Sequence, residues 1–133
     1  MKKLRFVGAL SLMLISVSAC SSGPPDLPDR ASPSVKAEEA RLAVLLGADT
    51  SIVDAPGVCK VRLLGQEAGV SFVWALCQAV PPATTGVSAP FRVSGSKVTK
   101  TQLGDYEGGV RKMFPEDLAD FVIDNPSSPE LRP

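Results

Sequence analysis

CKVRLLGQEAGVSFVWALC, residues 59–77, contains the clearest structural signal in this sequence. Two runs rich in aliphatic and aromatic residues, 59–64 and 70–77, flank the polar segment Gln66-Glu67-Ala68-Gly69, and this pattern predicts a β-hairpin. A three-residue loop over 67–69 places Gly69 where a left-handed backbone is required. Cys59 then lies directly opposite Cys77.

The predicted register gives the hairpin two distinct faces. One face is apolar throughout and carries the cross-strand pairs Cys59/Cys77, Val61/Ala75 and Leu63/Val73. A slip of one residue would break both the cysteine pair and the apolar face, so the register is strongly specified. The other face pairs Arg62 with Trp74 and Leu64 with Phe72. Because this second face is partly apolar as well, we expect the sheet to be covered on both sides.

Further strands and helices are predicted on either side of this hairpin. Towards the C-terminus, 81–86 is a loop, and residues 91–93 pair with 97–101 across Ser94-Gly95-Ser96, with Pro90 at a sheet edge. Towards the N-terminus, Ser32-Pro33 begins a helix over 33–46 that Gly47 ends, and 49–57 is a loop. On that helix Glu38, Glu39 and Arg41 are expected to face water.

The C-terminal part of the chain contains one clear helix signal. Pro115 begins a helix with Leu118, Phe121 and Val122 as its apolar stripe, and Asn125-Pro126 ends it. Residues 105–113 fit either a loop or a short helix. Together these elements predict an α+β fold, a small and mainly antiparallel sheet of about three to five strands with an N-terminal and a C-terminal helix.

The first twenty residues have the pattern of an export signal. Lys2, Lys3 and Arg5 precede an uncharged apolar run over 6–17. This run of about a dozen residues is too short to span a bilayer, which takes roughly 20. The run ends in Val17-Ser18-Ala19-Cys20.

These last four residues resemble the lipobox of bacterial lipoproteins, in which an aliphatic and two small residues precede a cysteine. The resemblance implies that residues 1–19 are a signal peptide and that Cys20 is acylated after cleavage. Because two or more acyl chains hold a protein firmly on a membrane, we expect a lipid anchor on the extracytoplasmic face of a cell membrane. An ordinary signal peptide cleaved after Ala19 is the alternative.

The remaining chain divides into a Pro/Ser-rich tether over 20–32, a single globular domain over 33–124 and a flexible tail over 125–133. With Cys20 acylated, Cys59 and Cys77 are left in a compartment where disulfides persist. Two free thiols or a metal half-site are the alternatives. The chain has no histidine, however, and two cysteines alone cannot make a tetrahedral zinc site. We therefore predict a disulfide that closes the hairpin.

Charge and motif content narrow the function classes. Loss of residues 1–19 removes three of the 14 basic residues and none of the 14 acidic ones, so the mature chain is mildly acidic and a nucleic-acid partner is not expected. The lack of histidine excludes His-dependent catalytic triads. Because the sequence has no phosphate-binding loop and no metal-binding motif, no cofactor is predicted.

Three functions are compatible with these features. The first is a non-enzymatic module that binds an envelope protein or a small ligand. Five basic residues could converge on its partner, or could be scattered charges that keep an edge strand from pairing with another chain: Arg92, Lys97, Lys100, Arg111 and Lys112. The second is a carboxylate-dependent envelope hydrolase, using Asp105 with Glu107 or the carboxylates at 116, 117 and 120. The third is a small ligand carrier or inhibitor, for which Trp74 and Arg62 are the candidate ligand-facing residues.

The domain is also similar to small uncharacterised lipoproteins of high-G+C Gram-positive bacteria. The similarity lies in Val73-Trp74-Ala75, in the segment SAPFRV over 88–93 and in the segment FPED over 114–117. It implies no activity. Because the lipobox provides an anchor and no catalytic constellation stands out, we favour the non-enzymatic binding module.

Overall fold

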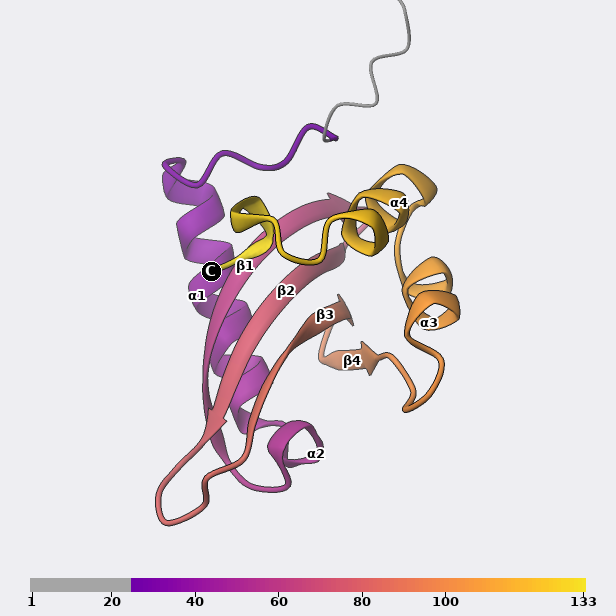
Figure 1. Cartoon of the computed structure of the whole chain (residues 1–133). Coiled ribbons are helices and arrows are strands. Elements are labelled where there is room, and N and C mark those ends of the chain that lie inside the picture. The colour runs from indigo at the N-terminus through magenta and orange to yellow at the C-terminus, as the bar shows by residue number, and fades with distance from the viewer. Residues whose placement is uncertain (1–24) are drawn as a thin grey trace, which may run out of the picture.

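The computed structural model describes residues 25–133 of the chain. Within this range the chain forms an α+β fold, as the sequence predicts, with the helices packed around an antiparallel sheet (Figure 1). The predicted signal peptide over 1–19 and the acylation site Cys20 lie outside the described residues. Among the helices within 25–133, none is long and apolar enough to cross a membrane.

The sheet has four strands in the order β1-β2-β3-β4, all antiparallel to their neighbours. The strands are β1 (Gly57–Glu67), β2 (Val70–Ala79), β3 (Gly86–Ser94) and β4 (Lys97–Lys100). The second hairpin therefore exists, but β3 begins earlier than the predicted residue 91. Its turn is Gly95-Ser96 alone, because Ser94 pairs with Lys97.

The register of the first hairpin is confirmed at Cys59/Cys77, Val61/Ala75 and Leu63/Val73, and the disulfide joins Cys59 to Cys77. The predicted three-residue loop is wrong. Glu67 pairs with Val70, so the loop is Ala68-Gly69, with φ of 48° and 80°. Two successive positive φ values are typical of a type I′ turn, whose twist matches that of the strands.

A β-bulge at Leu64 restores the register that this shorter turn would otherwise shift. Phe72 pairs with Gly65 rather than with the predicted Leu64, and the pairing is displaced by one residue between Leu63 and Gly65. A bulge inserts one extra residue into one strand of a pair. The turn and the bulge each shift the pairing by one residue in opposite senses, so the cysteines still lie opposite each other.

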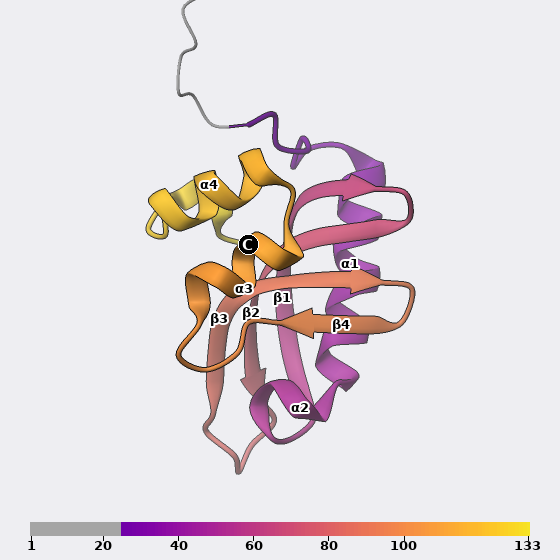
Figure 2. The ribbon, with the colours of Figure 1, turned by 90° about the vertical axis from the view of Figure 1, so that its right-hand side faces the viewer.

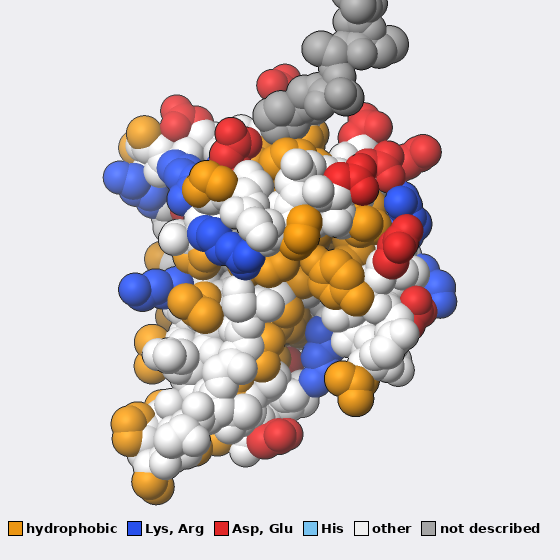
Figure 3. Space-filling view, viewed as in Figure 1, with side chains coloured by type: hydrophobic (Ala, Val, Ile, Leu, Met, Phe, Trp, Pro, Cys, Tyr) orange, Lys and Arg blue, Asp and Glu red, His pale blue; other side chains and the backbone are white. Residues whose placement is uncertain are grey.

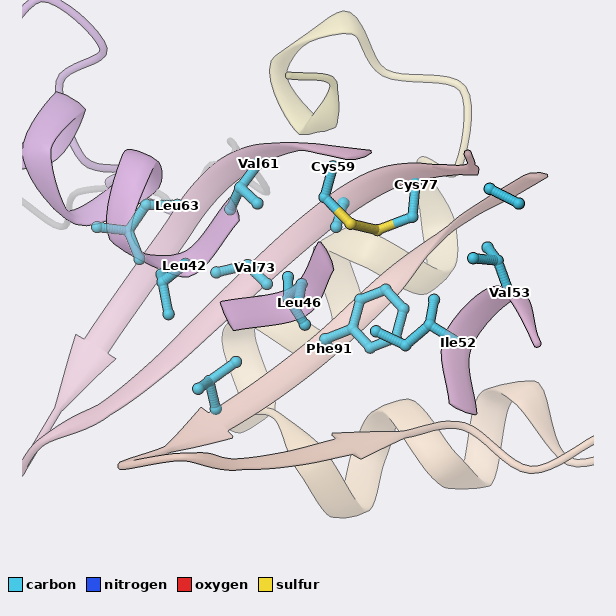
Figure 4. Close-up of a cluster of buried hydrophobic side chains, with 13 residues drawn as sticks. Leu42, Leu46, Ile52, Val53, Cys59, Val61, Leu63, Val73, Cys77 and Phe91 are labelled. Atoms are coloured by element: carbon cyan, nitrogen blue, oxygen red, sulfur yellow. A yellow bond between two sulfur atoms is a disulfide. The ribbon is translucent and has the colours of Figure 1, made fainter. Parts of the chain in front are cut away.

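One face of the sheet packs against two helices, α1 (Pro33–Ala48) and α2 (Thr50–Val53). Leu42 and Leu46 of α1 point towards Val73 and Phe91 of the sheet, beside the disulfide (Figure 4). Ile52 and Val53 of α2 close the lower end of this core, so the predicted loop over 49–57 contains a helical turn. Asp49 begins that turn by accepting a hydrogen bond from the Ser51 N–H.

The opposite face packs against α3 (Tyr106–Met113) and α4 (Glu116–Asp124), as Figure 2 shows. The ambiguous segment 105–113 is thus a helix despite Gly108-Gly109. Its Val110 and Met113 join Leu118 and Val122 of α4 in a second core. The Phe72 ring meets the Phe114 ring edge-on with centroids 5.5 Å apart. The sheet is therefore covered on both sides.

The predicted flexible tail over 125–133 is packed against the domain instead. It contains a 3-10 helix, η1 (Pro129–Leu131), whose Leu131 side chain is fully buried in the second core. The guanidinium of Arg30 donates to the carbonyls of Pro129 and Glu130 at 2.9 Å. Part of the predicted tether is fixed as well, since Leu27 packs against the same core. The folded unit therefore extends beyond the predicted limits 33–124 at both ends.

Candidate functional site

The two residues predicted to face a ligand are buried. Trp74 and Arg62 are each 4% exposed. Trp74 donates through Nε1 to Ser88 Oγ at 2.9 Å, and the Arg132 guanidinium lies 4.5 Å from the centre of its ring. Arg132 also donates to Ser88 Oγ. The chain's own C-terminal segment thus occupies the face that the carrier hypothesis needs to be open, and these residues do not form a ligand surface.

Arg62 holds three segments of the chain together. Its guanidinium donates to the carbonyls of Pro28, Leu63 and Glu130, at 2.9, 2.9 and 3.2 Å. Burial, more than repulsion by Arg30, lowers the pKa of Arg62 from its ordinary value. A buried cation with all its near partners inside the chain has a structural role.

The carboxylates singled out by sequence do not converge on one cavity. Asp105 lies at the start of α3 against Gly108. Asp120 of α4 lies 2.7 Å from Arg111 of α3 and so ties the two helices together, whereas Glu107 lies 3.5 Å from Arg111 within α3. The hydrogen bond that Arg111 donates to Asp120 raises the pKa of the Arg111 guanidinium. On α1, the prediction that Glu38 and Glu39 only face water is wrong.

Those two glutamates instead contact the sheet. Glu39 accepts a hydrogen bond from the Leu63 N–H at 2.7 Å, and Glu38 accepts one from the buried Ser71 hydroxyl at 3.3 Å. The hydrogen bond from Arg41 is the main reason that the pKa of Glu38 is lowered. Glu39 thereby covers a backbone donor on the outer edge of β1.

A different trio of carboxylates lines a cavity of about 410 Å³ near the N-terminal segment. Asp26, Glu67 and Asp117 come from three separate segments and surround the apolar side chains of Leu64, Phe72 and Leu118. Sequence reasoning missed Asp26 and Glu67, because nothing in their spacing brings them together. Among the described residues, no group of three His, Cys, Asp or Glu side chains is arranged to hold a metal ion.

A second cavity, larger than the carboxylate-lined one, forms a groove beside β3. Strand β4 pairs with β3 only over residues 91–94, so in the described chain residues 86–90 of β3 have no neighbouring strand on that side. A cavity of about 620 Å³ occupies this place. We call it the β3 groove; its lining residues are Ile52, Val87, Ala89, Phe91, Lys100, Thr101, Gln102, Leu103, Gly104 and Tyr106.

The β3 groove is apolar at its base and carries polar groups around it. Ile52 and Phe91 are buried, whereas Leu103 is fully exposed and Tyr106 is 39% exposed. Lys100 Nζ donates to the Ser51 carbonyl at 2.8 Å. Burial raises the pKa of the Tyr106 phenol, and the positive charge of Arg132 acts in the opposite direction. Figure 3 shows the surface hollowed beside the lower part of the sheet, with apolar side chains gathered between the sheet and the α3–α4 side.

The volume and lining of the β3 groove fit a binding site. Ligand sites are typically concave, about 300–1,000 Å³ in volume, and mostly apolar with a few polar groups. None of the described residues that line this groove is acidic. Of the five basic residues predicted to converge on a partner, only Lys100 lines the groove. The sequence did contain one signal, since β4 is short and Pro90 marks a strand edge.

Comparison with known proteins adds no further constraint. The chain matches no protein-family model, no curated protein and no solved structure. The site is therefore interpreted from its own geometry.

Proposed function

We propose that the protein is a membrane-anchored extracytoplasmic lipoprotein whose folded domain is a non-enzymatic binding module. The β3 groove is the observation that carries the proposal. It combines a volume of about 620 Å³ with buried apolar side chains at its base and exposed Leu103 and Tyr106 at its rim. Large apolar side chains that remain exposed beside a concavity are characteristic of interaction sites.

The anchor part of the proposal rests on the lipobox. With Cys20 acylated, only residues 21–24 separate the lipid-bearing residue from Pro25, the first residue of the fixed N-terminal segment. Four extended residues reach at most about 14 Å, so the domain would stand close to the membrane. Figure 1 places the N-terminal segment at one end of the domain and α2, which borders the β3 groove, at the other. The groove then lies towards the end of the domain that is farther from the membrane.

Cys20→Ala tests the anchor. We expect the variant to leave the membrane fraction or to accumulate as an uncleaved precursor, because the acyl chains provide the membrane affinity. Ser22→Ala is the control, since it changes a residue near the lipobox but leaves Cys20 and the disulfide intact. An unchanged membrane fraction for Cys20→Ala would refute the lipid anchor.

Leu103→Glu tests the groove. Leu103 is fully exposed, so the fold should tolerate the change while the rim of the groove gains a charge. Val44→Glu is the control, because Val44 is 76% exposed on α1, away from the groove. After crosslinking in cells and recovery of the full-length chain, we expect the specific partner to be lost with Leu103→Glu and kept with Val44→Glu. Equal recovery with both variants contradicts binding at this groove.

The carboxylate-lined cavity keeps the hydrolase as a second candidate. Its three carboxylates surround an apolar floor, an arrangement in which two carboxyl groups can serve as acid and base. Glu67→Gln and Asp117→Asn are the test variants, because both residues are exposed and the changes conserve shape. Loss of a measured turnover from an envelope glycan, with unchanged thermal stability, would favour this function over the binding module.

A further inference from the structure

We propose that the β3 groove binds one extended peptide segment of a partner protein, which adds to the sheet as a strand beside residues 86–90. This inference rests on the proposed function and specifies the class of its partner. The added segment would continue the line of β4 after β4 ends at Lys100. Strand addition requires that β3 have unpaired backbone N–H and C=O groups on this side.

In an antiparallel pair, successive residues point their backbone N–H and C=O groups alternately towards and away from the neighbouring strand. The distance between the two cysteines shows which residues point which way. The Cα atoms of Cys59 and Cys77 lie 4.1 Å apart, close to the separation of about 4.5 Å for a non-hydrogen-bonded pair in antiparallel strands. The backbone groups of Cys59, Val61 and Leu63 therefore point away from β2. The Leu63 N–H agrees, since it bonds Glu39 rather than a strand.

The same alternation continues across β2 into β3. The backbone of Cys77 and Ala79 points towards β3, and the Ala79 N–H bonds the Thr85 carbonyl. On β3, Val87, Ala89 and Phe91 then point back to β2 through their backbone groups. Gly86 and Ser88 point the other way, where the described chain provides no strand. The backbone nitrogen of Pro90 is on the same outward side as those of Gly86 and Ser88. Because proline has no N–H, this position leaves no unpaired donor.

The open half of β3 is thus a short strand edge with specific backbone groups. Ser88 and Gly86 are exposed and offer two N–H donors and two carbonyl acceptors at strand spacing. Main-chain hydrogen bonds of this kind provide affinity in strand addition, and pockets for alternate side chains provide specificity. The half-buried Val87 and Ala89, with Ile52 and Phe91, form such an apolar pocket on one side of the edge.

The other edge of the sheet is protected, which distinguishes the β3 edge as the binding site. On β1, Glu39 occupies the outward Leu63 N–H and the exposed Lys60 discourages pairing with another chain. The end of α1 lies against the start of β1, because a side chain at Gly47 would meet the Gly57 carbonyl at 2.6 Å. Ser88 is exposed, and the contacts that Trp74 and Arg132 make with it are to its hydroxyl and not to its backbone.

A single segment fits the β3 groove better than a second copy of this chain. Neighbouring strands lie about 4.8 Å apart, so one extended segment needs little width between α2 and residues 101–104. A second copy pairing through the same edge would bring its own α2 and its own 101–104 segment to the same place. Lys100 is the one charged residue among the lining residues described, which favours an uncharged or acidic segment over a basic one.

The test uses a photo-crosslinking residue, benzoylphenylalanine, at position 103 of the full-length chain in cells that naturally produce it. The backbone contact is tested with Ser88→Pro, which removes the outward N–H, and with the matched control Ser88→Ala. Both variants lose the Ser88 hydroxyl that bonds Trp74 and Arg132, so they differ in the backbone N–H and in the restriction that the proline ring places on φ. Trp74 fluorescence verifies that both remain folded.

We expect crosslinks to one short stretch of one partner protein, reduced at least tenfold by Ser88→Pro but not by Ser88→Ala. Crosslinks that Ser88→Pro leaves unchanged would overturn strand addition while leaving binding at the groove intact. Crosslinks to this chain itself, or to a small molecule, would also overturn the peptide proposal. No crosslink from position 103 would refute the groove as the binding site and with it the proposed function.

If Ser88→Pro does not fold, amide hydrogen exchange replaces it. The probe is then a synthetic peptide with the sequence of the crosslinked stretch. Strand addition requires that the peptide slow exchange at the Ser88 and Gly86 amides and leave the Val58 amide on β1 unchanged. Unaltered exchange at Ser88 overturns the proposal.

Discussion

Three arginines fix the two ends of the described chain to the sheet. Arg62 of β1 donates to the Pro28 carbonyl of the N-terminal segment. Arg30 of that segment donates to the Pro129 carbonyl near the C-terminus, and Arg132 donates to the Pro126 carbonyl within the C-terminal segment. Hydrogen bonds from charged groups contribute about 1.5–3 kcal/mol each, more than neutral ones. Polar residues that looked like surface or ligand-facing side chains in the sequence therefore act as connections inside the fold.

The Cys59–Cys77 disulfide should make a large contribution to the free energy of unfolding. Replacing Cys59 and Cys77 together by alanine should lower the free energy of unfolding by about 3 kcal/mol, because a closed loop of this size restricts the unfolded chain. Urea denaturation of the double variant measures the loss. Reductant should destabilise the wild-type protein and leave the double variant unaffected; equal sensitivity would show that the bond does not contribute.

Asp49 provides a pH-dependent contribution at the start of α2. The hydrogen bonds from the Ser51 hydroxyl and N–H lower the pKa of Asp49 below its ordinary 3.8. The folded state therefore favours the charged form, and this stabilisation is complete above the unfolded pKa and lost as pH falls through the folded pKa. Asp49→Ala should cost about 1 kcal/mol at pH 7, with the difference shrinking below pH 3.8.

Asp49→Asn is the matched variant for this effect, because asparagine also caps helices but does not titrate. Thermal melts from pH 7 to pH 2.5 compare the three proteins. The asparagine variant should keep most of the stability at neutral pH and lose less of it in acid than the wild type. Parallel acid profiles for aspartate and asparagine would contradict the assigned role.

At the scale of elements, the first hairpin shows how local signals combine. Alternating apolar residues and the paired cysteines predicted the register correctly, although the loop was predicted one residue too long. The type I′ turn at Ala68-Gly69 and the bulge at Leu64 compensate each other. The bulge reconciles the two-residue turn with the register that the buried face and the disulfide require.

The turn contains an alanine in an unfavourable conformation. Ala68 has a φ of 48°, in the left-handed region that costs a residue with a Cβ roughly 1–2 kcal/mol. Ala68→Asn should raise the free energy of unfolding by about 0.5–1 kcal/mol, because Asn-Gly is strongly preferred in type I′ turns. Glu67→Asn, at the flanking position whose φ is not positive, is the control. Chemical denaturation that shows no gain at position 68 would argue against this turn type.

At the scale of the whole molecule, the two chain ends complete the second core. Leu27 and Leu131 pack with Trp74, Leu64 and Val122 over the sheet face that α1 does not cover. A sheet face left partly apolar by its sequence must bury that surface against another layer. The terminal segments provide part of this cover, and their removal would expose Trp74.

Leu131→Ala tests this dependence. The side chain is fully buried, and such truncations typically cost about 2–5 kcal/mol. Trp74 emission should shift to longer wavelength at lower denaturant concentration than in the wild type, because the indole loses its cover. Glu130→Ala, which alters an exposed side chain, should change stability by no more than about 0.5 kcal/mol. Equal stability of the two variants would show that the tail is dispensable.

The candidate sites were harder to predict than the fold. The β3 groove forms because β4 ends at Lys100, α2 lies beside β3, and the chain turns over 101–104. All three features depend on how the elements pack together. The carboxylate cavity likewise joins Asp26, Glu67 and Asp117 from distant parts of the chain. Sequence spacing encodes contacts within one element, whereas these contacts arise only when elements dock.

The sequence alone was enough to predict the α+β class, the existence of both hairpins and the pairing of Cys59 with Cys77. Side-chain periodicity and turn residues act over a few positions, and a strand pair with one apolar face permits only one register. Tertiary structure alone decided that the tail is fixed, that Arg62 and Trp74 are buried, and that half of β3 stays open. These outcomes depend on which surfaces remain to be covered after the hairpins and helices have formed, and no local pattern records that.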